Sequence, residues 1–237
     1  GVSIGSHTAG GVSNLMVINC TFDHPAAGLR IKSDRDRGGC VHDLTYRNLR
    51  MTNVGCPILI YGAYMATNRE FRALNKLTAA IAARYARHAV VSRTPIYRDI
   101  TFSNITATVQ PGSRAGLIWG LPEMNVTNVV LQNVRITADK PFGIYDAQNV
   151  RLVDTQIITP EGTNVLSCTN AHAIPASRYL PSENVSTKNP RSSRNTRGFT
   201  STSPASGSAT ASIATRRARR PAGTCRSRSS PSHRRAS

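Results

Sequence analysis

The sequence has little that points to a metal site, a redox centre or a membrane. Its five cysteines form no Cys-x-x-Cys pair and its histidines stand in unrelated settings, so no zinc or redox motif follows. No apolar run is long enough to span a bilayer, and this chain contains no signal peptide. We therefore expect no metal, no cofactor and no membrane-spanning helix.

Acidic residues are also scarce, but the charge imbalance is local. The chain has 30 basic and 12 acidic residues, a formal charge of +18. Residues 191–237 hold eleven arginines and no acid, which leaves +7 for the first 190 residues. Because the body is only mildly basic, we do not expect a nucleic-acid partner except for the tail.

The tail lacks the residues needed to fold. Residues 191–237 consist mainly of Arg, Ser, Ala, Pro, Thr and Gly, and such a segment cannot bury enough apolar surface to offset the entropy of ordering. We expect it to be disordered. GC-rich DNA translated in the wrong frame would look similar, so a gene-model artefact and a functional basic arm are both open.

What the sequence does contain is a short internal repeat. The pattern is Asn or Asp, aliphatic, any residue, apolar, any residue, Asn or Asp. The starts are 29, 56, 29 and 21 residues apart, and 56 is about two periods with an insertion. The five copies are residues 14–19, 43–48, 99–104, 128–133 and 149–154.

A second apolar strand follows each of the first four copies by 14 to 17 residues, starting at Gly28, Pro57, Gly116 and Gly143. Each repeat thus supplies two or more short strands separated by turns. Such strands cannot bury a face alone but can stack on their neighbours, which predicts an all-β solenoid, a parallel β-helix. Leucine-rich repeats fit less well, because their Leu spacing and their helix are missing.

An amide or carboxylate ends each copy where the chain must turn. Asparagine tolerates left-handed backbone geometry, and its amide can bond turn backbone or a stacked neighbour. We assign these residues a structural role, which also argues against glycosylation at the two sequons that start at Asn19 and Asn104. The five positions are Asn19, Asn48, Asn104, Asn133 and Asp154.

An insertion at about residues 66–90 has a helical pattern. Thr67 and Glu70 fit a capping box, and apolar residues recur at spacings of three and four. We expect this helix to dock on the side of the solenoid; binding to a membrane surface is the alternative. The apolar positions are Phe71, Leu74, Leu77, Ile81 and Tyr85.

These patterns divide the chain into three parts. We expect a β-helix over residues 1–175 that includes the insertion, a closing segment over 176–190, and the disordered tail over 191–237. The repeat fades after Pro160, and Val165-Leu166-Ser167-Cys168 is expected to begin the closure of the solenoid.

The stretch Gly28-Leu29-Arg30-Ile31-Lys32 combines a structural pattern with a chemical one. In a strand, Leu29 and Ile31 face one way while Arg30 and Lys32 face the other, with the two cations about 6.6 Å apart. A solvated face is the plain alternative. Asp34 and Asp36 follow on a loop that ends in Gly-Gly and reads as a solvated turn, and no two carboxylates are placed beside a histidine as acid/base catalysis would require.

Two motifs together resemble glycoside hydrolase family 28, the polygalacturonases that cut pectin. Gly1-Val2-Ser3-Ile4-Gly5-Ser6 is similar to the end of the family's Gly-His-Gly and Ser-Ile-Gly-Ser motifs, and Arg30-Ile31-Lys32 matches its Arg-Ile-Lys motif. The resemblance runs to about Ala173. It implies a right-handed parallel β-helix in which Arg30 and Lys32 hold a uronate carboxylate. Tyr64 is the best match to the family's site tyrosine, with Tyr61 second.

The resemblance also implies what this chain does not contain. In the family, the catalytic aspartates and histidine precede the position of Gly1, so no catalytic residue is expected here. Inverting hydrolysis of α-1,4-galacturonosyl bonds needs two carboxylates about 6.5–9.5 Å apart. We expect the C-terminal part of such an enzyme, with the substrate clamp but negligible activity.

The remaining expectations also follow from the resemblance. The partner would be an acidic polysaccharide, the chain a monomer, and the location secreted or periplasmic, with any signal lying before Gly1. Two alternatives stay open: a non-catalytic β-helix that binds carbohydrate or serves as a structural repeat, and a calcium-dependent pectate lyase. The lyase would need an acidic calcium cluster, which the sequence does not show.

Overall fold

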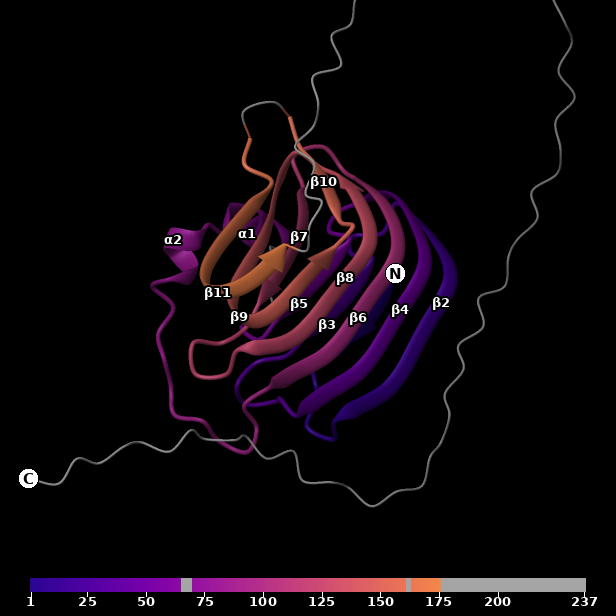
Figure 1. Ribbon diagram of the computed structural model, residues 1–237. Coiled ribbons are helices and arrows are strands. Elements are labelled where there is room, and N and C mark those ends of the chain that lie inside the picture. Colours follow the sequence, from indigo (N-terminus) through magenta and orange to yellow (C-terminus); the bar gives the residue numbers. More distant parts are fainter. Residues whose placement is uncertain (65–69, 161–162, 176–237) are drawn as a thin grey trace, which may run out of the picture.

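The computed structural model describes residues 1–64, 70–160 and 163–175. Within them the chain forms a solenoid of stacked strands with two short helices on one side (Figure 1). Its elements, in chain order, are β1 (Val2–Ile4), β2 (Val12–Asp23), β3 (Leu29–Lys32), β4 (Cys40–Val54), β5 (Ile58–Tyr61), α1 (Glu70–Lys76), α2 (Ala79–Ala82), β6 (Ile96–Val109), β7 (Arg114–Trp119), β8 (Val126–Thr137), β9 (Lys140–Val153), β10 (Gln156–Ile158) and β11 (Leu166–Pro175).

Every pairing between these strands is parallel. The short strands β1, β3, β5 and β7 stack in order on one side, and the long strands β2, β4, β6 and β8 stack on the other. Strand β9 joins the two stacks, because its first half pairs with β7 and its second half with β8. The predicted parallel β-helix is confirmed.

The five copies of the repeat lie directly on one another. Leu15 pairs with Leu44, Leu44 with Ile100, Ile100 with Val129 and Val129 with Val150. The second apolar position stacks in the same way, so that Tyr46 lies parallel to Phe102 with their ring centroids 5.1 Å apart. The shared pattern of the copies thus becomes columns of similar side chains inside the solenoid, although the copies are unequally spaced in the sequence.

The strands are longer than the sequence predicts. Each copy was expected to be a short strand that ends in a turn, but β2, β4, β6 and β8 run continuously for 12 to 15 residues. They bend instead of ending, because the residues at both ends of every copy have a φ of 46° to 57°. Asn and Asp adopt this left-handed geometry more readily than other residues with a side chain.

The bend residues also bond to one another from strand to strand. Asn48 donates its amide to the Asn19 carbonyl oxygen at 2.9 Å, Asn104 to that of Asn48 at 3.0 Å, and Asn133 to that of Asn104 at 2.9 Å. This column confirms the predicted stacking. A second column, which was not predicted, lies at the first position of the repeat, where Asn128 donates to Asp99 at 2.9 Å and Asn149 donates to Asn128 at 2.8 Å.

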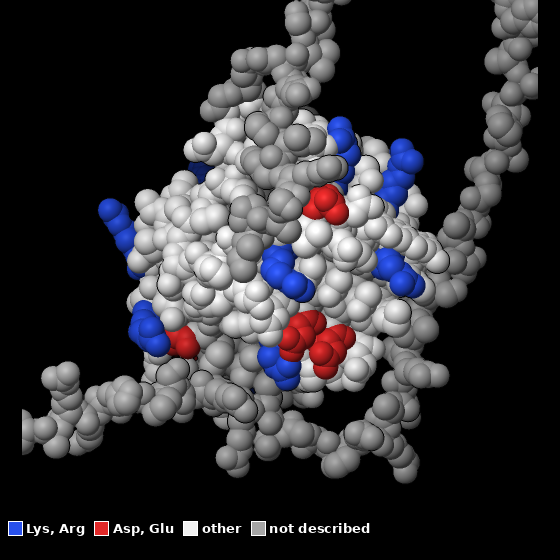
Figure 2. Space-filling view, in the orientation of Figure 1, with Lys and Arg blue, Asp and Glu red and all other residues white. Residues whose placement is uncertain are grey.

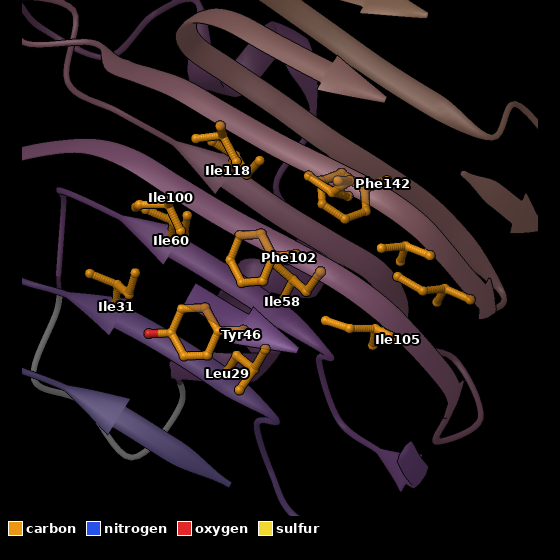
Figure 3. Close-up of a cluster of buried hydrophobic side chains, with 14 of the residues drawn as sticks. Leu29, Ile31, Tyr46, Ile58, Ile60, Ile100, Phe102, Ile105, Ile118 and Phe142 are labelled. Atoms are coloured by element: carbon orange, nitrogen blue, oxygen red, sulfur yellow. The ribbon is translucent and has the colours of Figure 1, made fainter. Parts of the chain in front are cut away.

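The interior is filled by aliphatic and aromatic side chains from both stacks (Figure 3). Leu29, Ile31, Ile58 and Ile60 from the short strands are each no more than 1% exposed. The glycine before β3 is needed for this packing, since a Cβ on Gly28 would lie 2.7 Å from the backbone oxygen of Pro57 and 2.4 Å from the Met51 sulfur.

The insertion differs from its prediction. One helix was expected over residues 66–90, but the described part holds two short helices and no helix after Ala82. The second is capped by Thr78, whose hydroxyl accepts from the Ile81 amide. The predicted capping residue Thr67 lies outside the described residues. Leu74 and Leu77 are buried as the stripe predicts, whereas Ile81 is 53% exposed, because the break between the helices turns it away from the solenoid.

The solenoid continues beyond the fifth copy. Strand β11 pairs in parallel with β9, with Leu166 opposite Phe142, and β10 pairs with β8. The predicted closing segment at 176–190 and the tail at 191–237 lie outside the described residues, so this division of the chain stays a prediction.

The amide column gives a direct test of what holds the bends. Replacing Asn48 by Ala removes its two side-chain hydrogen bonds, to Asn19 and Asn104. Alanine also adopts left-handed backbone geometry less readily than asparagine, so we expect a loss of about 2 kcal/mol in the free energy of unfolding. Asn48→Gly removes the same bonds without the strain and should lose about half as much. Urea unfolding followed by circular dichroism measures both; equal stability of all three chains would show that the column does not stabilise the bends.

Candidate functional site

Strand β3 places two cations on the outer surface of the short-strand stack. Leu29 and Ile31 belong to the core, and Arg30 and Lys32 alternate with them, as the sequence predicts. Arg30 is partly exposed, whereas Lys32 is only 8% exposed. The strand is short and its core residues are fully packed, so the positions of these two cations are fixed.

Tyr64 holds the Lys32 ammonium in place. The Lys32 Nζ lies 4.1 Å from the centroid of the Tyr64 ring, a cation–π contact. Tyr61, the second choice for the site tyrosine, is fully buried beneath and makes an edge contact with Tyr64 at 6.0 Å. Tyr64 is therefore the tyrosine that the structure brings to the cations.

Arg30 is oriented by the neighbouring strand. Its Nε donates to the Ser3 hydroxyl at 3.1 Å, and the two residues are directly opposite in the pairing of β1 with β3. The motif that contains Ser3 and the motif that contains Arg30 are thus adjacent in space. A planar guanidinium and a point charge side by side can hold a carboxylate, the first by a forked pair of hydrogen bonds and the second by its charge.

The turn after β3 is structural, as the sequence suggests. The Asp34 carboxylate accepts from the Asp36 backbone amide at 3.1 Å and from Arg37 Nε at 2.8 Å. Asp36 is exposed at the tip. The Arg37 guanidinium, which Asp34 holds, also lies over the Tyr64 ring, with its Cζ 6.0 Å from the ring centroid.

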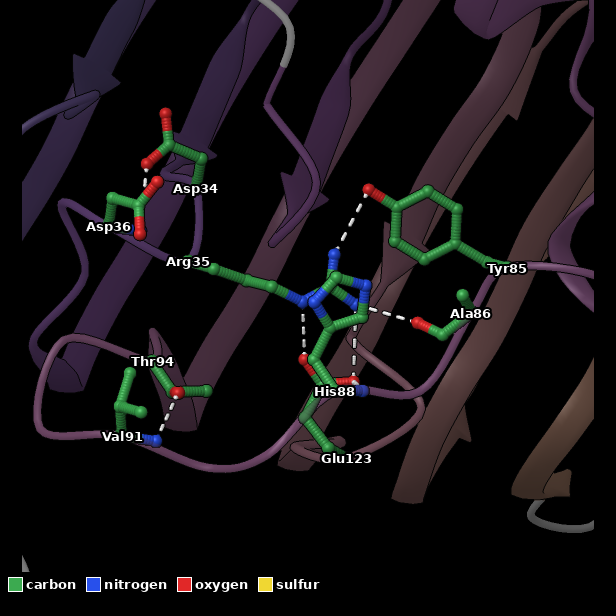
Figure 4. Close-up of polar contacts among 9 residues, drawn as sticks. All are labelled: Asp34, Arg35, Asp36, Tyr85, Ala86, His88, Val91, Thr94 and Glu123. Carbon is green, nitrogen blue, oxygen red and sulfur yellow. Dashed lines mark hydrogen bonds and ion pairs between the residues drawn. The ribbon is translucent and has the colours of Figure 1, made fainter.

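A network that the sequence did not reveal fixes this turn to the rest of the solenoid (Figure 4). Arg35 forms an ion pair with Glu123 at 2.5 Å, and the Glu123 side chain is only 1% exposed. Arg35 also donates to the Ala86 carbonyl at 2.9 Å, and the His88 amide donates to Glu123 at 3.3 Å. The pair is 88 residues apart in sequence, and no local pattern marks either partner.

The charge of Glu123 is maintained by its partners. Burial alone would raise the pKa of this carboxyl, but the hydrogen bond from Arg35 and the backbone amides outweigh it, and the pKa lies below its usual value. The same contact raises the pKa of Arg35. Both groups are therefore charged at neutral pH and act as one structural unit.

Two other ionisable groups, Asp146 and Cys56, are buried and so are poorly placed to react with a ligand at the surface. Asp146 is 4% exposed, its Oδ1 accepts from Asn170 at 2.6 Å, and burial raises its pKa. The nearby Trp119 indole acts in the opposite direction and lowers the pKa of Asp146. Its Nε1 makes no hydrogen bond of ordinary geometry within the described residues. Burial raises the pKa of the Cys56 thiol to about 12, which leaves it unreactive at neutral pH.

The described residues hold no group of three or more His, Cys, Asp or Glu side chains arranged to bind a metal ion. Among them, none of the helices has the length and apolar character to cross a membrane. On the face shown in Figure 2, basic side chains are scattered, some of them beside acidic side chains, and do not merge into one patch. Arg30 and Lys32 on β3 remain the candidate site.

The chain is similar to known proteins over most of its described length. The family model for glycosyl hydrolases family 28 matches residues 1–154. An endo-polygalacturonase of Pectobacterium parmentieri is 29% identical over 150 residues, which cover 61% of this chain and 29% of that protein. A polygalacturonase of Ralstonia nicotianae is 44% identical over 71 residues, 28% of this chain and 13% of that protein. The matches span less than a third of these relatives, and no solved structure matches.

The Arg35–Glu123 pair predicts a pH dependence of stability. A folded-state pKa below the usual 4.5 means that the pair stabilises the fold above that value and loses its effect as the pH falls through the folded pKa. Glu123→Gln should cost about 2–4 kcal/mol at pH 7. The difference from the native chain should shrink below about pH 4.

Melting temperatures of both chains, measured from pH 3 to pH 8, test this. Asp36→Asn, which removes an exposed carboxylate from the same turn, is the control and should change little. A Glu123→Gln deficit that stays constant at all pH values would contradict the role of the charged pair.

Proposed function

The chain belongs to glycosyl hydrolases family 28, and from this premise we propose that it forms part of an enzyme that hydrolyses α-1,4-galacturonosyl bonds in pectin. Within that enzyme, Arg30 and Lys32 bind the carboxylate of a galacturonate residue. The observation that carries the proposal is the pair of fixed cations on β3, held by Ser3 and Tyr64 at the surface of the sheet.

The electrostatics of the pair favour an anionic sugar. Lys32 is nearly buried, and among the described residues no acidic side chain forms an ion pair with it. An ammonium in such a place has lost much of its water, so a ligand carboxylate interacts with it more strongly than it would with an exposed lysine. The Tyr64 ring beside it also offers an apolar surface on which a sugar ring can pack.

The chain as given supplies the binding half of the reaction. Inverting hydrolysis needs an acid that protonates the leaving oxygen and a base that activates water. In the turn after β3, Asp34 is engaged with Arg37 and Asp36 is exposed at the tip. In the turn after β7, Glu123 is engaged with Arg35. We infer that the 237 residues bind the polysaccharide but do not cut it.

The same reasoning extends to partners and location. Pectin is an acidic polymer that cannot enter a cell intact, so an enzyme that acts on it works outside the cytoplasm, secreted or in the periplasm. One solenoid carries every residue of the proposed clamp, so a monomer suffices. The relatives are named as polygalacturonases, which is the reason to prefer this substrate over other uronates.

Binding of trigalacturonate tests the proposal. Arg30→Ala and Lys32→Met should each weaken binding about tenfold to a hundredfold, because each removes a charge-assisted contact of about 1.5–3 kcal/mol. Calorimetry at about 0.15 M salt limits the contribution of distant charges such as those of the tail.

Arg47→Ala is the matched control, since Arg47 is an exposed cation on β4 in the other stack. It should bind like the native chain. Equal losses of affinity for Arg30→Ala and Arg47→Ala would mean non-specific attraction of a polyanion. They would refute the proposal that Arg30 and Lys32 bind the uronate carboxylate.

Turnover is a separate measurement. The purified 237-residue chain should release no reducing ends from polygalacturonate above background, while it still binds trigalacturonate. Hydrolysis that disappears in Arg30→Ala would show that the chain contains its own acid and base. Calcium-dependent release of unsaturated products would instead support the lyase alternative.

A further inference from the structure

The outer surface of the short-strand stack changes character at β5. In one row of paired residues, Ser3 and Arg30 are followed by Leu59 and Leu117. In the next row, Lys32 is followed by three aromatic residues, Tyr61, Trp119 and Tyr145. Adjacent strands are about 4.8 Å apart. The polar part of the surface thus ends at the two cations, and the next strand, β5, is already apolar.

Beyond that point the surface is covered. Leu59, Leu117 and Tyr61 are fully buried, and Trp119 and Tyr145 are 4% and 1% exposed. They form a second apolar cluster, separate from the core of the solenoid. Both faces of β5 and β7 are therefore buried, which explains why these strands, apart from Arg114, are apolar without alternation.

Residues 73–88 provide the cover. Leu74, Leu77 and Ala82 pack into this second cluster, and the Tyr85 ring meets Trp119 edge to face at 5.1 Å. In Figure 1, helices α1 and α2 lie against the outside of the stack that contains β5 and β7. We call residues 73–88 the wall.

The wall is fastened to the sheet by polar contacts as well. Arg114, only 4% exposed, donates to the Leu77 carbonyl at 2.8 Å, and Lys140 donates to the Asn75 carbonyl at 3.3 Å. These cations bond carbonyls in the last turn of α1 and directly after it, where no intrahelical donor is available. Near the other end of the wall, the Arg35–Glu123 pair bonds the Ala86 carbonyl. The wall is thus packed and bonded at both ends, unlike a loosely attached lid.

We propose that the wall closes the carbohydrate-binding surface immediately beside Arg30 and Lys32, so that this pair receives the end of a galacturonate chain. A chain that runs along the solenoid axis can extend from the cations across β1 but not across β5, β7 and β9. The inference rests on the proposed function, because it gives the direction and the limit of the same binding surface.

End-labelled trigalacturonate tests the wall. One preparation carries a bulky fluorescent group on the reducing end, and the other carries it on the non-reducing end. In the native chain we expect one label to weaken binding at least tenfold and the other less than twofold, since one end lies against the wall and the other points away from it.

Two variants of the wall complete the experiment. Leu77→Asp places a charge in the second apolar cluster and should displace the wall, which brings the two labels within threefold of each other. Ile81→Asp adds the same charge at a 53% exposed position of α2 and should keep the native preference. Circular dichroism checks that the solenoid stays folded in both variants, which we expect because its core is separate from the second apolar cluster.

The outcomes separate the two proposals. If the native chain tolerates both labels equally and Arg30→Ala still weakens binding, the wall inference is overturned and the proposed function is left intact. This comparison does not depend on the folding of any wall variant. No binding of unlabelled trigalacturonate overturns the proposed function, and the wall inference with it.

Discussion

The in-register stacking of parallel strands is the constraint on which the structure depends. Each strand satisfies its backbone groups only through the strands above and below it, and a shift of one residue would turn the core side chains outward. The left-handed bends at both ends of every repeat fix where each strand changes direction. The amide column from Asn19 to Asn133 then holds these bends in line.

This framework is what makes a rigid site from only two motifs. Ser3 and Arg30 meet because β1 stacks on β3, and Lys32 meets Tyr64 because the chain leaves β5 beneath it. The Arg35–Glu123 pair joins the turn after β3 to the turn after β7. Side chains from distant parts of the sequence therefore hold the site with little freedom, which favours recognition of a planar carboxylate.

Local patterns predicted the solenoid, the asparagine column and the outward direction of Arg30 and Lys32, since each depends on spacing within one repeat or on alternation within one strand. The same patterns failed for the insertion. Ile81 fits an apolar stripe but is exposed, because two short helices replace the expected one. No pattern in the sequence marked the roles of Glu123 and Trp119, because Glu123 pairs with Arg35 and Trp119 packs on Tyr85. Both partners are distant in sequence.

The most direct test of the account is a crystal structure of the chain with digalacturonate. The account predicts that a uronate carboxylate lies within about 2.7–3.0 Å of both the Arg30 guanidinium and the Lys32 ammonium, with the sugar against Tyr64. A sugar bound on the outer surface of β4 and β6, with the Arg30–Lys32 pair empty, would contradict it.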